Sequence, residues 1–489
     1  MERLNFEDDR LWMRLLMLGI LLNIIVCFTS DLGLDTQVKM AVDEDGALPW
    51  GDLRPETAGE SDPTDGGQRV VLPLYSMSEV GIKAMALLTF AGMIACVYRW
   101  AGVRSAAVLS LSPAFIFSIG RGYEEVYLAV FCAASFLLFT GFFSSKNRTL
   151  QTFGGGFAFM LMPYAKGFTG GTGILVGSLV LTVLATLWNE VQQRGGAKTS
   201  WMSKPHIVGI VVSLTVSLCL IALGILEYNS TLSIMVESPI RYITALAFSV
   251  LDLVIIFTLF GMVLWPFVGP MLQGLKSVED SKTALMTGYI AGIMTALVFY
   301  VAALWTYEAS IWNANWPGVI WTMGNNGRYA TLLFIPLVVL LQQLRLHIEV
   351  PTYDVPLSKA KVMGLTVLLL LPLSLLASLH GQTMWTDEAA NEMELSNGEH
   401  FLYVSEDTLG MHWLYTFYAP LDAEEKGITG HWRSVDSTWE SDLDSTLSQV
   451  TTLVVSPEVT LTPTGWIVES SGEVNLLNGG GEWRVLTRS

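Results

Sequence analysis

Long uninterrupted runs of apolar residues are the feature that most constrains this chain. A run of roughly 20 apolar residues matches the hydrocarbon thickness of a bilayer, and only 15% of all residues are charged. Because lipid cannot satisfy backbone polar groups, such runs are expected to form helices. The sequence therefore predicts a polytopic membrane protein with about eleven transmembrane helices, over 11–28, 80–97, 105–119, 126–142, 150–162, 172–187, 207–226, 245–264, 284–304, 330–344 and 362–379.

Lysine and arginine are distributed unevenly between the loops that join these segments. With the N-terminus in the cytoplasm, the inner loops hold most of them, and the short outer loops hold only Arg121, Lys166, Arg241 and Arg328. This asymmetry sets membrane orientation. It predicts a multi-pass protein of the cell membrane with a cytoplasmic N-terminus and a long first extracytoplasmic loop at 29–78.

The last hundred residues differ in kind from the rest. We expect a transmembrane domain over 1–380 and a small extracytoplasmic α/β domain over 381–489. Short strand-like runs separated by turn residues occur in the second part, at 401–404, 451–455, 465–469, 473–477 and 483–486. The net charge of −17 argues against nucleic acid as a partner.

An acidic pair, Asp31 and Asp35, stands where the first helix leaves the membrane. If the helix continued, the i,i+4 spacing would place both carboxylates on one face, whereas Gly33 favours a turn equally well. Such a pair can act as a general base or hold a divalent cation such as Mg²⁺ or Mn²⁺. The alternative is a solvated helix end with no further role.

Charged residues recur at the outer ends of several helices. Arg121 lies beside Glu124 and Glu125, and single cations stand in three further outer loops. At one membrane level these cations can form an anion site, and an arginine suits a phosphate because it donates parallel charge-assisted hydrogen bonds. A structural salt bridge at a helix end is the alternative for Arg121 and its neighbours. The four cations are Arg121, Lys166, Arg241 and Arg328.

The layout resembles the GT-C superfamily of membrane glycosyltransferases. The points of similarity are Asp31, with Asp35, after the first helix, the many helices with short ones among them, the Gly327-Arg-Tyr329 sequence that opens a late helix, and the C-terminal domain. The oligosaccharyltransferase signature Trp-Trp-Asp-Tyr-Gly is absent. An Asp-Glu or Asp-x-Asp pair is also absent after the first helix, which leaves the branch of the superfamily open.

The resemblance implies a polyprenyl- or dolichyl-phosphate-linked sugar as the donor and a glycan, lipid or protein as the acceptor. Asp31 would act as the general base in an inverting displacement on the extracytoplasmic face, with Asp35 or Glu124 positioning the acceptor and Glu125 in a supporting role. A metal is not required. The departing phosphate would be held by Arg328 and Tyr329, together with Arg121, Lys166 or Arg241.

Two other classes of function remain open from the sequence. A transporter or flippase would use Asp252, a carboxylate within the eighth predicted helix, and the outer cations as a pathway. Such proteins usually contain internal repeats, and the sequence shows no matching pair of helix groups. The third class is a non-catalytic receptor or assembly factor that acts through the C-terminal domain.

Overall fold

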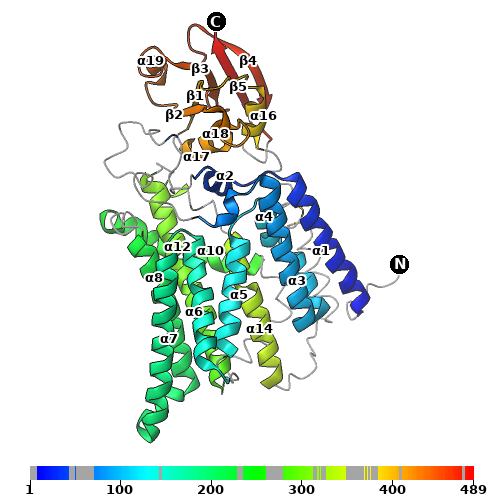
Figure 1. The fold of residues 1–489 in the computed structure, drawn as a ribbon, viewed down its shortest axis with the longest axis vertical. Helices are drawn as coiled ribbons and strands as arrows, with labels where there is room; N and C mark the ends of the chain where they lie inside the picture. Colours follow the sequence, from blue (N-terminus) through cyan, green and yellow to red (C-terminus); the bar gives the residue numbers. More distant parts are fainter. Residues whose placement is uncertain are drawn as a thin grey trace.

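A helical bundle carries a small sheet domain at one end (Figure 1). The computed structural model describes residues 8–42, 50, 71–141, 146–227, 235–259, 278, 280–311, 316–318, 320, 327–347, 368, 372, 375, 384–406, 410–475 and 480–489.

Helices form in the first ten of the predicted segments, as the hydropathy pattern requires. They are α1 (Asp9–Thr29), α3 (Glu79–Ser110), α4 (Pro113–Gly120), α5 (Glu125–Gly141), α6 (Arg148–Ala165), α7 (Gly171–Arg194), α8 (Pro205–Glu227), α10 (Pro239–Leu259), α12 (Ser281–Ile311) and, after the 3-10 turn η5 (Gly327–Ala330), α14 (Thr331–His347). The eleventh segment, 362–379, lies outside the described residues apart from three positions. Within the described part, five helices are long and apolar enough to cross a membrane, or six if a bent pair counts as one span. These helices indicate a multi-pass membrane protein.

The bent pair corresponds to the third predicted segment, which is not one straight helix. The end of α3 and the whole of α4 meet at an angle of 58°. Proline has no N–H to donate and disfavours helix in the residue before it, and Pro113 opens α4. The helix that forms in the second predicted segment, 80–97, is longer than expected. The α3 helix continues to Ser110 through Gly102, where the backbone departs from helical geometry with φ 88°.

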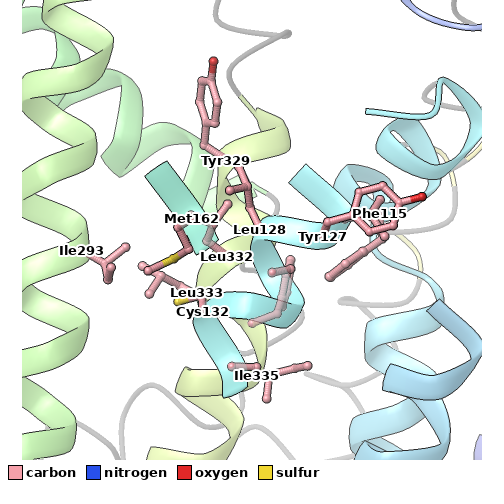
Figure 2. Packing of buried hydrophobic residues seen from close by; sticks show 14 of the residues in the cluster. Phe115, Tyr127, Leu128, Cys132, Met162, Ile293, Tyr329, Leu332, Leu333 and Ile335 are labelled. Atoms are coloured by element: carbon pink, nitrogen blue, oxygen red, sulfur yellow. The ribbon is translucent and has the colours of Figure 1, made fainter. Parts of the chain in front are cut away.

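The interior of the bundle is a single large apolar core. Figure 2 shows Tyr329 beside Leu128 and Leu332 at one end of this packing, with Cys132 and Ile335 further along. The α5 and α14 helices contact each other here, and α6 packs on α5. The ends of these helices nearest the C-terminal domain are therefore held by close apolar packing, which leaves little freedom for the polar residues at those ends.

The C-terminal domain contains five strands in the order β2-β1-β3-β5-β4. They are β1 (His400–Ser405), β2 (Thr429–Ser434), β3 (Val450–Val455), β4 (Trp466–Glu473) and β5 (Glu482–Arg488). The β1 strand pairs in parallel with β2 and β3, whereas β5 pairs antiparallel with β3 and β4. Alternate residues of β1 enter two separate cores, Phe401 and Tyr403 on one face and Leu402 and Val404 on the other.

Short helices cover the two faces of this sheet. On the Phe401 face lie α16 (Trp385–Glu392), α17 (Gly410–Leu414), the 3-10 turn η6 (Tyr415–Phe417) and α18 (Ala423–Lys426), while α19 (Trp439–Leu443) lies on the opposite face. The small α/β architecture expected from the sequence is confirmed.

Two strand predictions needed correction. The β2 strand was not predicted, although Gly430, Trp432 and Ser434 alternate as its buried residues. Its other residues are polar and it lies at the sheet edge, so the apolar signal is weak. The run predicted at 465–469 forms most of β4, which continues to Glu473 with an irregularity between Val468 and Ser470. Of the run predicted at 473–477, Glu473 alone among the described residues belongs to a strand, and 476–477 lie outside those residues.

Candidate functional site

The helix ends nearest the C-terminal domain converge beneath a short helix, α2 (Leu34–Met40), which lies between the bundle and that domain (Figure 1). The α1 helix ends at Thr29, and α2 begins after Gly33. The acidic pair is therefore separated by a turn and does not continue the first helix. Gly33 is needed here because a Cβ atom on it would lie 2.3 Å from the ring of Tyr123.

The turn between α4 and α5 holds α2 in place. The carbonyl of Arg121 accepts hydrogen bonds from the backbone N–H of Gly33, at 2.9 Å, and from the hydroxyl of Thr36, at 3.0 Å. Gly122 adopts φ 66°, and a Cβ atom there would press on Leu32 and on α3. The backbone of this turn thus fixes where Asp35 is presented.

Two buried glutamates follow this turn and form the base of an ion cluster. Lys166, which caps the end of α6, reaches Glu124 Oε1 at 2.5 Å and Glu125 Oε1 at 2.8 Å. Lys39 of α2 pairs with the other oxygen of Glu124. Both glutamates are almost fully buried, so removal of one cation would leave an uncompensated charge away from water.

Arg328 completes the cluster from η5. Its Nη1 lies 2.7 Å from Asp35 Oδ2, and its Nε lies 3.4 Å from Glu125 Oε1. The guanidinium packs between the rings of Tyr123, at 4.6 Å, and Tyr329, at 5.3 Å. Its side chain is 6% exposed, whereas that of Asp35 is 43% exposed, so Asp35 is the side of this pair that faces water.

The donor groups of Arg328 are not fully used. Although Nη1 and Nε are at ion-pair distance from carboxylates, neither is aligned in a hydrogen bond with any acceptor among the described residues. Nη2 contacts the hydroxyl of Tyr329 at 3.4 Å. Both groups keep their ion pairs with carboxylates while retaining hydrogen-bonding capacity for a further anionic oxygen.

The cluster as a whole stabilises its charged forms. Burial alone would raise the pKa of Glu124, but Lys166 and Lys39 hold that pKa well below its usual range. Asp35 keeps contact with water on one side, but its protein surroundings still disfavour ionisation, and Arg328 and Lys39 outweigh that effect to lower the pKa of Asp35. Lys166 is affected in the opposite sense, because the neighbouring glutamates raise its pKa despite burial. These directions favour the ionised forms of Asp35, Glu124 and Lys166 at neutral pH.

Asp31 belongs to a second and more acidic environment. Its carboxylate accepts a hydrogen bond from the backbone N–H of Met384, the residue that caps the start of α16. Burial raises the pKa of Asp31 above its ordinary value, and Glu79 adds to this effect. Nearby, burial together with Asp31 and Glu79 raises the pKa of Asp387 to about 7.

The structure thus brings together most, but not all, of the residues expected at the site. One cluster of contacts contains Asp35, Glu124, Glu125, Lys166, Arg328 and Tyr329. Asp31 lies in the adjoining acidic environment. Arg121 contributes its carbonyl, while its guanidinium stacks on Phe117 at 3.9 Å. Arg241 of α10 donates to Ser310 of α12 at 2.8 Å.

Several further residues of the site were not predicted. Lys39, in the long first loop, had no distinguishing pattern in the sequence. Tyr123 and Tyr300 complete the aromatic surroundings, since Tyr300 contacts the Tyr329 hydroxyl at 3.5 Å. Glu308 of α12 lies within electrostatic reach of Asp35 and Arg328; its position near a helix end is the one signal that would have pointed to it.

Asp252 is fully buried within α10. It lies eleven residues beyond Arg241 along this helix, which corresponds to a rise of about 16 Å. Asp252, the residue that a transport pathway would use, is therefore well away from the end of α10 that carries Arg241. Among the described residues, no group of three or more His, Cys, Asp or Glu side chains is arranged to hold a metal ion.

Comparison with known proteins adds little. No protein-family model matches the chain, and no curated protein matches it. The crystal structure of ArnT from Cupriavidus metallidurans bound to undecaprenyl phosphate aligns over 97% of this chain and 97% of that chain, with 13% sequence identity and a TM-score of 0.36. At that TM-score the likeness does not support a common fold or function.

Proposed function

We propose that this protein is a membrane glycosyltransferase of the GT-C type that moves a sugar from a polyprenyl-phosphate donor to an acceptor hydroxyl on the extracytoplasmic face. The observation that carries the proposal is the buried Arg328, whose Nε and Nη1 groups have no aligned hydrogen-bond acceptor among the described residues although both lie at ion-pair distance from carboxylates. An anionic lipid headgroup reaches this level of a membrane protein while its isoprenoid tail stays among the helices.

The donor phosphate would take the water-facing position that Asp35 now occupies beside Arg328. A phosphodiester carries one negative charge, so it replaces the Asp35 carboxylate charge for charge and leaves the other ion pairs intact. Lys166, which is 14% exposed, adds positive potential from the neighbouring helix end. These cations would stabilise the charge that grows on the phosphate as the glycosidic bond breaks.

Asp31 would act as the general base. The acceptor oxygen forms a bond to the anomeric carbon and gives its proton to Asp31, while the bond from that carbon to the phosphate oxygen breaks and its electron pair leaves with the polyprenyl phosphate. A single displacement inverts the anomeric configuration. Burial raises the pKa of Asp31, which strengthens it as a base.

The proposal is tested with purified protein in detergent and a radiolabelled polyprenyl-phosphate sugar. We expect wild-type protein to transfer label to an acceptor fraction and release polyprenyl phosphate. Arg328→Lys should raise the KM for the donor at least about tenfold, because lysine cannot donate two parallel bonds.

Arg121→Lys is the matched control, since its guanidinium stacks on Phe117 at 3.9 Å and donates to the Phe117 carbonyl; it should leave the donor KM unchanged. Absence of transfer with a panel of donors and acceptors, or equal effects of both substitutions, would contradict the proposal. Uptake of label into proteoliposomes that depends on Asp252 would instead favour a transporter.

A further inference from the structure

The α2 helix has two faces that contact two different parts of the molecule. Asp35 and Lys39, one turn apart, pair with Arg328 and Glu124 of the bundle. Val38 and Ala41 are buried in the core of the C-terminal domain. The same helix contacts α17 and η6 of that domain.

A helix of seven residues is too short to be stable by itself in water. Its shape and position therefore depend on what it packs against. On the bundle side, Arg121 holds the residues at its start. On the other side, Val38 is buried in the core of the C-terminal domain.

A second attachment lies further along the first loop. Trp50 donates a hydrogen bond from Nε1 to the carbonyl of Ile428 at 3.0 Å and stacks on Tyr415, with ring centroids 6.2 Å apart. The rings of Tyr418 and Phe401 meet its edges at 5.2 and 5.8 Å. A tryptophan enclosed by three aromatic rings and a hydrogen bond is a strong anchor.

A third attachment is the hydrogen bond from the Met384 N–H to Asp31. The first loop is thus joined to the C-terminal domain before α2, at α2 and after α2. The two residues that the bundle receives from α2, Asp35 and Lys39, lie between these attachments.

We propose that the C-terminal domain positions the donor-phosphate cluster through α2, with Val38 and Trp50 as positioning residues. Its catalytic consequence rests on the proposed transferase function, but the mechanical coupling does not. Loosening either residue should release α2 from the domain and make the Asp35–Arg328 and Lys39–Glu124 pairs less ordered, even though neither residue touches the cluster.

The coupling is tested by hydrogen exchange and mass spectrometry on the full-length protein in detergent. Trp50→Ala should raise exchange of the α2 amides at least about tenfold, the factor that corresponds to about 1.4 kcal/mol, while β1 and β3 stay protected. Trp50→Phe keeps the ring stacking and should restore most of the protection. Trp201→Ala, which removes an exposed tryptophan from the 3-10 helix η2 (Gly196–Ser203), is the matched control.

Trp50→Ala could also raise the exchange of the β1 and β3 amides. Val38→Ala is a smaller change in the same core and should then still raise the exchange of the α2 amides. Unchanged α2 exchange in a folded Trp50→Ala or Val38→Ala protein would overturn the coupling. In the transfer assay, Trp50→Ala should raise the donor KM, and Trp50→Phe should rescue it.

The two proposals fail in different ways. If α2 exchange rises in the variants but wild-type protein transfers no sugar, the coupling is supported and the transferase function is contradicted. If wild-type protein transfers sugar but α2 exchange is unchanged in the variants, the transferase function is supported and the coupling is contradicted.

Discussion

Asp31 and Asp35 are four residues apart, yet they occupy opposite electrostatic environments. Asp35 faces Arg328 and Lys39, which lower its pKa despite burial. Burial and neighbouring carboxylates raise the pKa of Asp31, and its carboxylate accepts a hydrogen bond from the backbone N–H of Met384 at the start of α16. The turn at Gly33 separates the two, because α2 starts in a new direction after α1 has ended.

Under the proposed transferase function, this difference suits two residues of the same type to different roles. A carboxylate held in ion pairs is a poor base, since its proton affinity is reduced. A partly buried carboxylate among other acids has a raised proton affinity and suits proton transfer. The comparison therefore favours Asp31 for the proton and Asp35 for the phosphate side of the site.

The largest expected effect separates the two residues directly. Asp31→Asn should lower kcat for transfer by about 10²- to 10⁴-fold, the usual contribution of a general base, with little change in donor KM. Asp35→Asn should change the donor KM by less than about tenfold. Glu392→Gln, an exposed carboxylate of α16, is the control. Equal losses of kcat in both aspartate variants would contradict the assignment of different roles to Asp31 and Asp35.

The next effect concerns the stability of the ion cluster. Arg328→Ala should lower the free energy of unfolding by about 3 to 5 kcal/mol, because it removes one of the three cations that balance the three carboxylates of the cluster and leaves one negative charge uncompensated. Arg241→Ala, which removes a less buried cation, should lower it by less than about 1 kcal/mol. Unfolding in detergent measures both, and similar values would show that the cluster is not the stabilising feature.

Gly33→Ala tests the turn that separates the two aspartates. Its Cβ atom would lie 2.3 Å from the Tyr123 ring, so Tyr123 must move from its place against Arg328. Overpacking of this kind destabilises by about 1 to 3 kcal/mol, and donor KM should rise as well. Gly170→Ala has open space around the added atom and should be neutral in both the unfolding and the transfer assays.

The smallest expected effect is a difference in pH dependence. Burial raises the pKa of Asp387 from 3.8 to about 7, so its contribution to stability is complete below about pH 4 and is lost as pH rises through 7. Glu124 has a lowered pKa, so its contribution is present above its unfolded value of 4.5 and is lost as pH falls further. Melting temperatures from about pH 4 to pH 8 should show a flatter decline in Asp387→Asn. An unchanged profile would contradict this assignment.

The sequence alone determined the elements that depend on local composition. Apolar runs of membrane length gave helices in all ten segments that the structure describes, and four of the five strand-like runs correspond to β1, β3, β4 and β5. Lys166, Arg328 and the Glu124–Glu125 pair could be expected at a common membrane level, since alternating helix ends must meet there.

Only the tertiary structure decided which of these charges meet. Lys39 and Glu124 are 85 residues apart, and no local pattern encodes a contact over that separation. The side chain of Arg121 turns away onto Phe117 while its carbonyl fixes α2. The two aspartates after the first helix differ because a turn at Gly33, required by the Tyr123 ring, directs one toward the bundle and leaves the other beside the C-terminal domain.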